Sequence, residues 1–295
     1  MKLFRLVSFL LLLSPVINAQ ESNLLEHHDV PYLPADQIEV DSLQRLNLII
    51  PLGVKNPPLL IWVGGGAWAF VDRNIEMELC KKIAQSGIAV ASVGHRLSTA
   101  RWVDSTRTEG VQHPAHTKDL AAATRWLFEK ADDYGYDPDQ IFVGGFSSGA
   151  YIATILMADH QFLTEKERKQ IRGILPIAGT FDIQHYHDYL LERRPVLAKD
   201  HVMAVFGDTQ DLLKQASVTE YMDNLEWPLL LMTDKNLKPY TKHFIDRLKA
   251  ESDFSDYKYV VTKEYGHREL WEHLSKSEES KYRQMMVDFI LGTKG

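Results

Sequence analysis

The stretch IFVGGFSSGAYIA, at residues 141–153, places a serine between glycines where an apolar run gives way to a helical pattern. Gly145, Ser147 and Gly149 spell G-x-S-x-G at that boundary. In a sharp turn from a strand into a helix, glycines relieve crowding and the serine hydroxyl is presented above the sheet edge. The pattern predicts such a nucleophile turn. The alternative is a glycine-rich helix entrance used only for packing, and the rest of the chain has to decide between the two.

Apolar runs of strand length alternate with longer helical patterns along the remaining sequence. This alternation predicts an α/β fold, with a mostly parallel twisted sheet covered by helices on both faces. Strands are expected at 46–51, 58–63, 88–93, 141–143, 173–177, 229–232 and 257–261, and helices at 75–86, 117–134, 148–158 and 282–291. Residues 181–217 are the one expected insertion, which is too short for a domain and supplies at most a small cap.

The first twenty residues, MKLFRLVSFLLLLSPVINAQ, have the pattern of a secretory signal peptide. Lys2 and Arg5 precede an apolar run at 6–13, and a small residue, Ala19, marks the expected cleavage site. We therefore expect a signal peptide at 1–19, a single domain at 20–295, and a periplasmic or secreted protein. The apolar run is too short for a comfortable membrane span, so no stable membrane insertion is expected after cleavage; an uncleaved anchor is the alternative.

Composition restricts the class of partner. The chain has 295 residues, of which 45% are hydrophobic and 25% charged, enough for one large α/β domain with a full core. The net charge of −7 and the absence of a basic run argue against nucleic acid as a partner. The lone Cys80 cannot form an internal disulfide. A small molecule is the expected partner.

A serine hydroxyl needs a base that removes its proton and an acid that orients the base. In a fold with this turn, the acid and then the histidine follow the serine, each after a later strand. Among twelve histidines, His267 has this position, because KYVVTKEYGHREL reads as a strand, a loop, Gly266 and then His267. His273 lies inside the next helical stretch and is expected at the surface. The sequence therefore predicts His267 as the base.

The predicted acid is Asp234, at the end of the strand in WPLLLMTDKNLKPYTKHF. The next acidic residue, Asp246, lies deep in the following helix. Two alternatives stay open: Asp234 only caps that helix, or Asn236 fills the place of a lost acid. Asp182, which follows the strand ending near Ala178, is the reserve candidate for the acid.

Attack on a carbonyl develops negative charge on its oxygen, which preorganised N–H donors must stabilise. The run LLIWVGGGAWAF supplies Gly64, Gly65 and Gly66 directly after an apolar strand, where backbone can approach a ligand closely. The N–H of Ser148, the residue after the nucleophile, is the second expected source. The triple glycine lacks the G-x-G-x-x-G spacing of dinucleotide binders and the GK[ST] ending of P-loops, which argues against a phosphate loop.

With these residues assembled, the chain resembles the α/β-hydrolase superfamily. The similarity is to its esterase/lipase branch, which includes hormone-sensitive-lipase-like carboxylesterases and the acetyl- and feruloyl-type esterases. It spans nearly all of residues 20–295 through the order of DVPYLP, RLNLIIP, VGGGAWAF, SVGHRLS, HPAHTKDLAAATRWL, DPDQIFVGGFSSGAYIA, FGDTQDLLKQAS and YGHREL. The resemblance implies an α/β-hydrolase fold, with Ser147 as nucleophile, His267 as base and Asp234 as acid.

The resemblance also implies Gly65, Gly66 and Ser148 as oxyanion donors, with one departure from the family pattern. The family writes His-Gly-Gly-Gly before an aromatic residue. Here Val63 or Gly64 holds the His position, depending on whether the alanine after the glycines is counted as an insertion. The missing imidazole leaves open which glycine N–H points at the oxyanion.

Two other groups of side chains have simpler interpretations. His185 and His187, two residues apart without a third ligand, are more typical of a polar loop than of a metal site. Trp68, Phe70 and Trp102 either line a substrate pocket or pack in the core.

The expected activity is therefore hydrolysis of small carboxylic esters by an exported serine hydrolase. The reaction is expected to pass through an acyl-enzyme and to use no metal or organic cofactor. The short insertion leaves little material for a lid, which favours small or soluble esters. Two alternatives stay open: an amidase such as an arylformamidase, which needs the same catalytic parts, and a hydrolase fold kept as a non-catalytic binding module.

Overall fold

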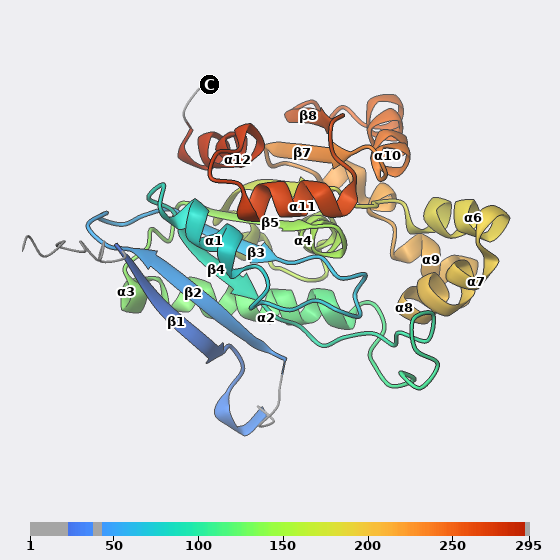
Figure 1. The fold of residues 1–295 in the computed structure, drawn as a ribbon, viewed down its shortest axis with the longest axis horizontal. Helices are drawn as coiled ribbons and strands as arrows, with labels where there is room; N and C mark the ends of the chain where they lie inside the picture. The colour runs from blue at the N-terminus through green and yellow to red at the C-terminus, as the bar shows by residue number, and fades with distance from the viewer. Residues whose placement is uncertain (1–22, 38–42, 293–295) are drawn as a thin grey trace, which may run out of the picture.

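A computed structural model describes residues 23–37 and 43–292 of the protein. The predicted signal peptide at 1–19 lies outside the described residues. An eight-stranded sheet forms the centre of the described part, in the order β1-β2-β4-β3-β5-β6-β7-β8 (Figure 1). Strand β2 pairs antiparallel with β1 and β4, and the pairs from β4 to β8 are parallel. The predicted mostly parallel sheet is confirmed.

The bounds of the elements are as follows. The strands are β1 (Leu24–Pro31), β2 (Arg45–Pro51), β3 (Leu59–Val63), β4 (Ala89–Val93), β5 (Ile141–Phe146), β6 (Ile171–Ile177), β7 (Leu229–Asp234) and β8 (Tyr257–Thr262). The longer helices are α1 (Met77–Ala84), α2 (Ala115–Glu129), α4 (Ser148–Ala158), α6 (Ile183–Arg193), α10 (Lys238–Glu251), α11 (His267–Lys276) and α12 (Lys281–Leu291). None of the described helices has both the length and the apolar character needed to cross a membrane.

The sheet is buried on both faces by two separate apolar clusters. In β3, Leu59, Ile61 and Val63 belong to one cluster, while Leu60 and Trp62 belong to the other. This division follows from the strand geometry, because successive side chains point to opposite faces. Helices α2, α4 and α10 contribute to the first cluster, and α1, α11 and α12 to the second (Figure 1). The predicted covering of both faces is confirmed.

Two details differ from the sequence-based expectation. Strand β1 was not predicted, because the polar run at 27–29 hides the apolar alternation; this edge strand also breaks its register between His27 and Val30. The helix expected at 117–134 is divided into α2 and the short α3 (Ala131–Tyr134). Lys130 separates them, since its backbone, with φ −100° and ψ 6°, leaves the helical region.

The insertion at 181–217 is a compact group of helices beside the sheet (Figure 1). It contains α6, α7 (Pro195–Leu197), a single π-helical stretch at Ala198–Met203, α8 (Ala204–Phe206) and α9 (Gln210–Gln215). Its size agrees with the expectation of at most a small cap.

Candidate active site

The predicted sharp turn between strand and helix is present at Ser147. Ser147 lies between β5 and α4 with φ 55° and ψ −115°, a backbone conformation that costs energy for any residue with a side chain. A Cβ on Gly149 would lie 2.0 Å from the Val63 carbonyl oxygen, and one on Gly145 would lie 2.4 Å from the Gly149 carbonyl carbon. Both positions therefore require glycine, and the close approach holds the serine at the edge of the sheet.

A chain of hydrogen bonds joins Ser147, His267 and Asp234, three residues far apart in the sequence. The Nε2 of His267 lies 2.9 Å from Ser147 Oγ, and its Nδ1 lies 2.7 Å from Asp234 Oδ2. The Phe146 ring stacks against the imidazole, with ring centroids 4.8 Å apart. The structure thus brings together the predicted nucleophile, base and acid in the order that a proton transfer requires.

The Asp234 side chain is fully buried, whereas the His267 side chain has a relative solvent exposure of 33%. The second oxygen of Asp234, Oδ1, accepts the N–H groups of Asn236 at 2.7 Å and Leu237 at 2.8 Å. The carboxylate therefore anchors the turn before α10 and contacts the imidazole at the same time. The Asn236 side chain contacts the base and not the nucleophile: its Oδ1 accepts the backbone N–H of His267 at 2.9 Å.

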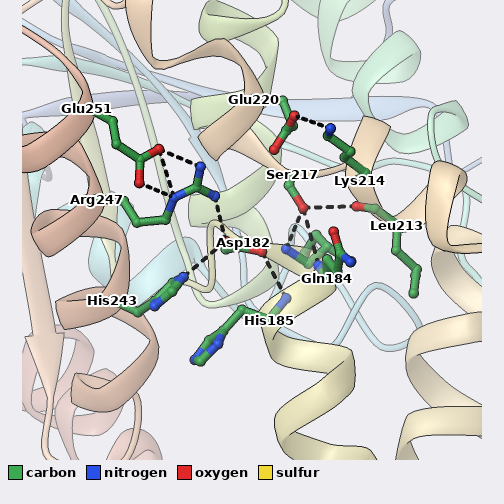
Figure 2. Close-up of polar contacts among 11 residues, drawn as sticks. Asp182, Gln184, His185, Leu213, Lys214, Ser217, Glu220, His243, Arg247 and Glu251 are labelled. Carbon is green, nitrogen blue, oxygen red and sulfur yellow. Dashed lines mark hydrogen bonds and ion pairs between the residues drawn. The ribbon is translucent and has the colours of Figure 1, made fainter.

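The reserve acid, Asp182, is engaged elsewhere (Figure 2). Its carboxylate accepts the His185 N–H at 2.8 Å, and its Oδ2 lies 3.0 Å from His243 Nε2 and 3.1 Å from Arg247 Nη1. Burial raises the pKa of Asp182, but the hydrogen bonds from His185, His243 and Arg247 outweigh burial and hold the pKa below its ordinary value. Asp182 thus caps α6 and ties it to α10, and the structure pairs His267 with Asp234 instead.

The glycine loop after β3 lies against the serine. A Cβ on Gly65 would be 3.1 Å from Ser147 Cβ, and one on Gly66, at φ +151°, would be 2.5 Å from the backbone of Phe70. Ser148 begins α4, and the first N–H groups of a helix have no acceptor within the helix. The three predicted oxyanion donors therefore lie on the two segments that flank the Ser147 hydroxyl.

A cavity of about 400 Å³ opens beside the serine. Its walls are mostly apolar, and its lining residues are Gly65, Gly66, Ala67, Phe70, Ile75, Glu76, Trp102, Phe146, Ser147, His267, Arg268 and Trp271. Phe70 and Trp102 thus line this space, whereas Trp68 is buried and packs against Tyr151 and Phe206. No residue of the insertion is among the described lining residues.

Glu76 is the one acidic side chain in this lining, and no sequence motif marks it. It is buried, and its two oxygens accept the indole N–H groups of Trp62 at 2.8 Å and Trp271 at 3.0 Å. Burial raises the pKa of Glu76 to about 7, although both indole N–H groups act in the opposite direction. At neutral pH this carboxyl is therefore only partly ionised.

The side chains of His185 and His187 have separate partners. The His185 ring stacks on His243 with centroids 3.8 Å apart, and His187 Nδ1 lies 2.9 Å from Asp188. Within residues 23–37 and 43–292, no three histidine, cysteine or acidic side chains are placed to hold a metal ion together.

Solved structures of similar fold define the class. Esterase B from Lactobacillus rhamnosis, in a form carrying a C6-C4 inhibitor, matches with a TM-score of 0.72 and 19% identity over 92% of this chain and 87% of that one. A truncated carbohydrate esterase from gut microbiota matches with a TM-score of 0.67 and 18% identity over 93% and 98%. With its mostly parallel sheet and its serine turn, the protein has the α/β-hydrolase fold.

The family follows from the sequence comparison. The model of the family described as BD-FAE matches residues 46–238, more than half of the chain. The chain belongs to the BD-FAE family, and the resemblance to the esterase branch of the α/β-hydrolases is confirmed.

Curated relatives are longer than this chain. Esterase LipQ of Mycobacterium tuberculosis is 26% identical over 211 residues, which cover 69% of this chain and 47% of LipQ. A probable isoprenylcysteine alpha-carbonyl methylesterase ICME of rice (Oryza sativa subsp. japonica) is 28% identical over 50% of this chain and 35% of its own length. The chain spans less than half the length of these relatives.

Replacing Glu76 with Gln should make the stability of the protein less sensitive to alkaline pH. The folded pKa of about 7 lies above the ordinary value of 4.5, so the folded state binds this proton more tightly than the unfolded chain. The stabilisation is complete below pH 4.5 and is lost as the pH rises through 7. Between pH 5 and 8.5 the free energy of unfolding of the wild type should fall by about 2–3 kcal/mol relative to Glu76→Gln, as measured by urea unfolding. A difference that stays constant over this range contradicts the prediction.

Proposed function

We propose that the protein is a serine carboxylesterase that hydrolyses small carboxylic esters through an acyl-enzyme. The observation that carries this proposal is the continuous hydrogen-bond chain from Ser147 through His267 to Asp234, at the edge of a cavity. The esterase names of relatives such as LipQ favour the same bond type.

In this mechanism Ser147 Oγ attacks the ester carbonyl while His267 Nε2 takes the hydroxyl proton. Asp234, buried and hydrogen-bonded to Nδ1, fixes the imidazole tautomer and stabilises the imidazolium that forms. His267 then gives the proton to the departing alcohol, and the serine is left acylated. Water attacks the acyl group in the same way, with His267 again as base. The bond from the acyl carbon to Ser147 Oγ then breaks, His267 returns the proton to this oxygen, and the carboxylic acid product leaves.

The negative charge on the carbonyl oxygen develops between the glycine loop and the start of α4. The N–H groups of Gly65, Gly66 and Ser148 are the proposed donors, because their segments flank Ser147 on both sides. The positive end of the α4 dipole acts in the same direction, since the N-terminus of a helix favours negative charge.

The cavity supports a small substrate. Its volume of about 400 Å³ lies at the lower end of the range for small-molecule sites, and Phe70, Trp102 and Trp271 give it apolar walls. The helices of the insertion contribute none of its described lining residues, so a large lid has no part in the proposed binding mode.

An amidase with the same triad is the second enzymatic candidate, and a binding module without catalysis is the third. The relatives named esterases argue for the ester over the amide. The triad contacts at 2.7 Å and 2.9 Å argue for an enzyme over a binding module, because a chain without catalysis has no need to keep this alignment.

Export is proposed from the sequence at 1–19 alone. When the chain is expressed from Met1 in a Gram-negative host, we expect the protein recovered from the periplasm to begin at Gln20 because of cleavage after Ala19. N-terminal sequencing of the purified protein measures this. A protein that keeps Met1 and stays in the cytoplasmic fraction would show that the segment is no signal peptide.

Replacing Ser147 with Ala should leave the fold intact and remove both covalent labelling and ester turnover. The variant loses the attacking oxygen but keeps every apolar contact of the turn. The test is labelling of purified protein with a fluorophosphonate probe, mapping of the labelled residue, and turnover of p-nitrophenyl acetate. If Ser147→Ala is still labelled at another serine and still active, the nucleophile has been misassigned.

Replacing Asp234 with Asn should lower kcat for p-nitrophenyl acetate by roughly 10³–10⁴-fold, because an amide there disfavours the tautomer that leaves Nε2 free to accept a proton. Asp182→Asn is the matched control, since Asp182 is paired with Arg247 and His243. The control should keep kcat within about threefold, measured where circular dichroism shows both variants folded. A larger loss in Asp182→Asn than in Asp234→Asn would transfer the acid role to Asp182.

A further inference from the structure

The buried carboxyl of Glu76 connects two parts of the site that are far apart in the sequence. Trp62 lies in β3, two residues before the glycine loop begins at Gly64, and Trp271 lies in α11, four residues after His267. Each indole donates its N–H to a different oxygen of the same carboxyl, at 2.8 Å and 3.0 Å. One side chain therefore links the strand that leads into the oxyanion loop to the helix that carries the base.

The two hydrogen bonds of Glu76 hold β3, which leads into the glycine loop, and α11, which begins at His267. Residues four apart on a helix share one face, so the side of α11 that Glu76 holds is also the side of His267. Trp62 is fully buried, and its ring contacts the sheet next to Gly144 of β5, the strand that leads to Ser147. A shift of either indole would move the loop or the imidazole relative to the serine.

The glycine loop is also shaped directly by this carboxyl. A Cβ on Gly64 would lie 2.7 Å from Glu76 Cγ and 2.8 Å from Glu76 Oε1. Glu76 thus occupies the space that a side chain at position 64 would need, so the loop backbone can pass this close to the carboxyl only with a glycine there. It lines the same cavity as Ser147 and His267.

Isolated burial of a carboxyl is costly unless hydrogen bonds compensate. Both oxygens of Glu76 have an indole donor: the Trp62 ring belongs to the core cluster that covers this face of the sheet, and the partly buried Trp271 ring packs against that cluster. Both hydrogen bonds therefore end on rings that the core packing holds in place.

We propose that Glu76 is a positioning residue that sets the oxyanion loop and the His267 helix in register with Ser147 through its bonds to Trp62 and Trp271. This inference rests on the proposed esterase function. In this role Glu76 acts through Trp62 and Trp271 and does not contact the reacting atoms.

The test compares Glu76→Gln, Trp271→Phe and the double variant Glu76→Gln/Trp271→Phe with the wild type. Trp271→Phe keeps an aromatic ring but removes the pyrrole part of the indole together with its N–H donor. Trp227→Phe is the matched control, because Trp227 also has an indole N–H with one hydrogen bond, to the Arg168 carbonyl at 3.2 Å, and it is not among the residues that line the cavity. The measurements are kcat and KM for p-nitrophenyl acetate, the rate of fluorophosphonate labelling, and thermal unfolding.

Glu76→Gln and Trp271→Phe should each lower kcat about tenfold, because misplaced groups weaken the transition state. Glu76→Gln, which keeps the size of the side chain, should leave KM within about twofold, whereas the KM of Trp271→Phe is no criterion because this change also removes part of the cavity wall. The double variant should lose no more than the worse single variant, because either change already breaks the link between the two indoles, and Gln at 76 keeps one acceptor oxygen for Trp62. The labelling rate should fall in parallel, and Trp227→Phe should match the wild type in kcat and labelling.

A wild-type protein that is labelled at Ser147 and active, with unchanged kcat in Glu76→Gln and Trp271→Phe, overturns the positioning role and leaves the esterase function standing. Independent, additive losses in the double variant overturn it as well, because they would mean two unrelated effects. If Glu76→Gln does not fold, Trp271→Phe against Trp227→Phe decides by the same criteria. A wild type that is neither labelled nor active overturns the esterase function, and the positioning role with it.

Discussion

The arrangement of the site depends on one close contact, the crossing of Gly149 over the end of β3. The Val63 carbonyl lies so near that a Cβ on Gly149 would be 2.0 Å from its oxygen. Strands β3 and β5 are parallel neighbours with Val63 opposite Gly145, so this contact lays the start of α4 directly on the start of the glycine loop. The strained backbone of Ser147 and the proximity of the loop to its hydroxyl both follow from it.

The order of the strands explains why the other two groups arrive at the same edge. Parallel strands end on one side of a sheet, so the residues after β5, β6, β7 and β8 meet there. Sequence alone could predict this edge, and it ranked Asp234 ahead of Asp182. It could not exclude Asp182, because both acids follow strands. In the structure Asp182 is engaged by His243 and Arg247 and not by His267, and the reach of those two side chains depends on how α10 lies on the sheet.

Most of the sheet was predictable because buried parallel strands are continuous apolar runs between glycine and proline signals. Strand β1 was missed because an edge strand with one exposed face and a bulge keeps little of that signal. Glu76 was missed for a different reason. An acidic residue at the start of a helix is an ordinary, exposed feature that favours the helix dipole, and its burial depends on Trp271, 195 positions away in the chain.

Gly64 and Glu76 lie side by side at the point where this chain departs from the pattern of the esterases that it resembles. Where those sequences carry an imidazole before the glycines, this chain has either Val63, whose side chain belongs to the core on the opposite face, or Gly64. A side chain at Gly64 has no room while Glu76 is present, since the two would overlap at 2.7 Å. The carboxyl of Glu76 in this position thus requires a glycine at 64. The glycine loop thus has a buried carboxyl beside it, which the indoles of Trp62 in β3 and Trp271 in α11 hold from two sides.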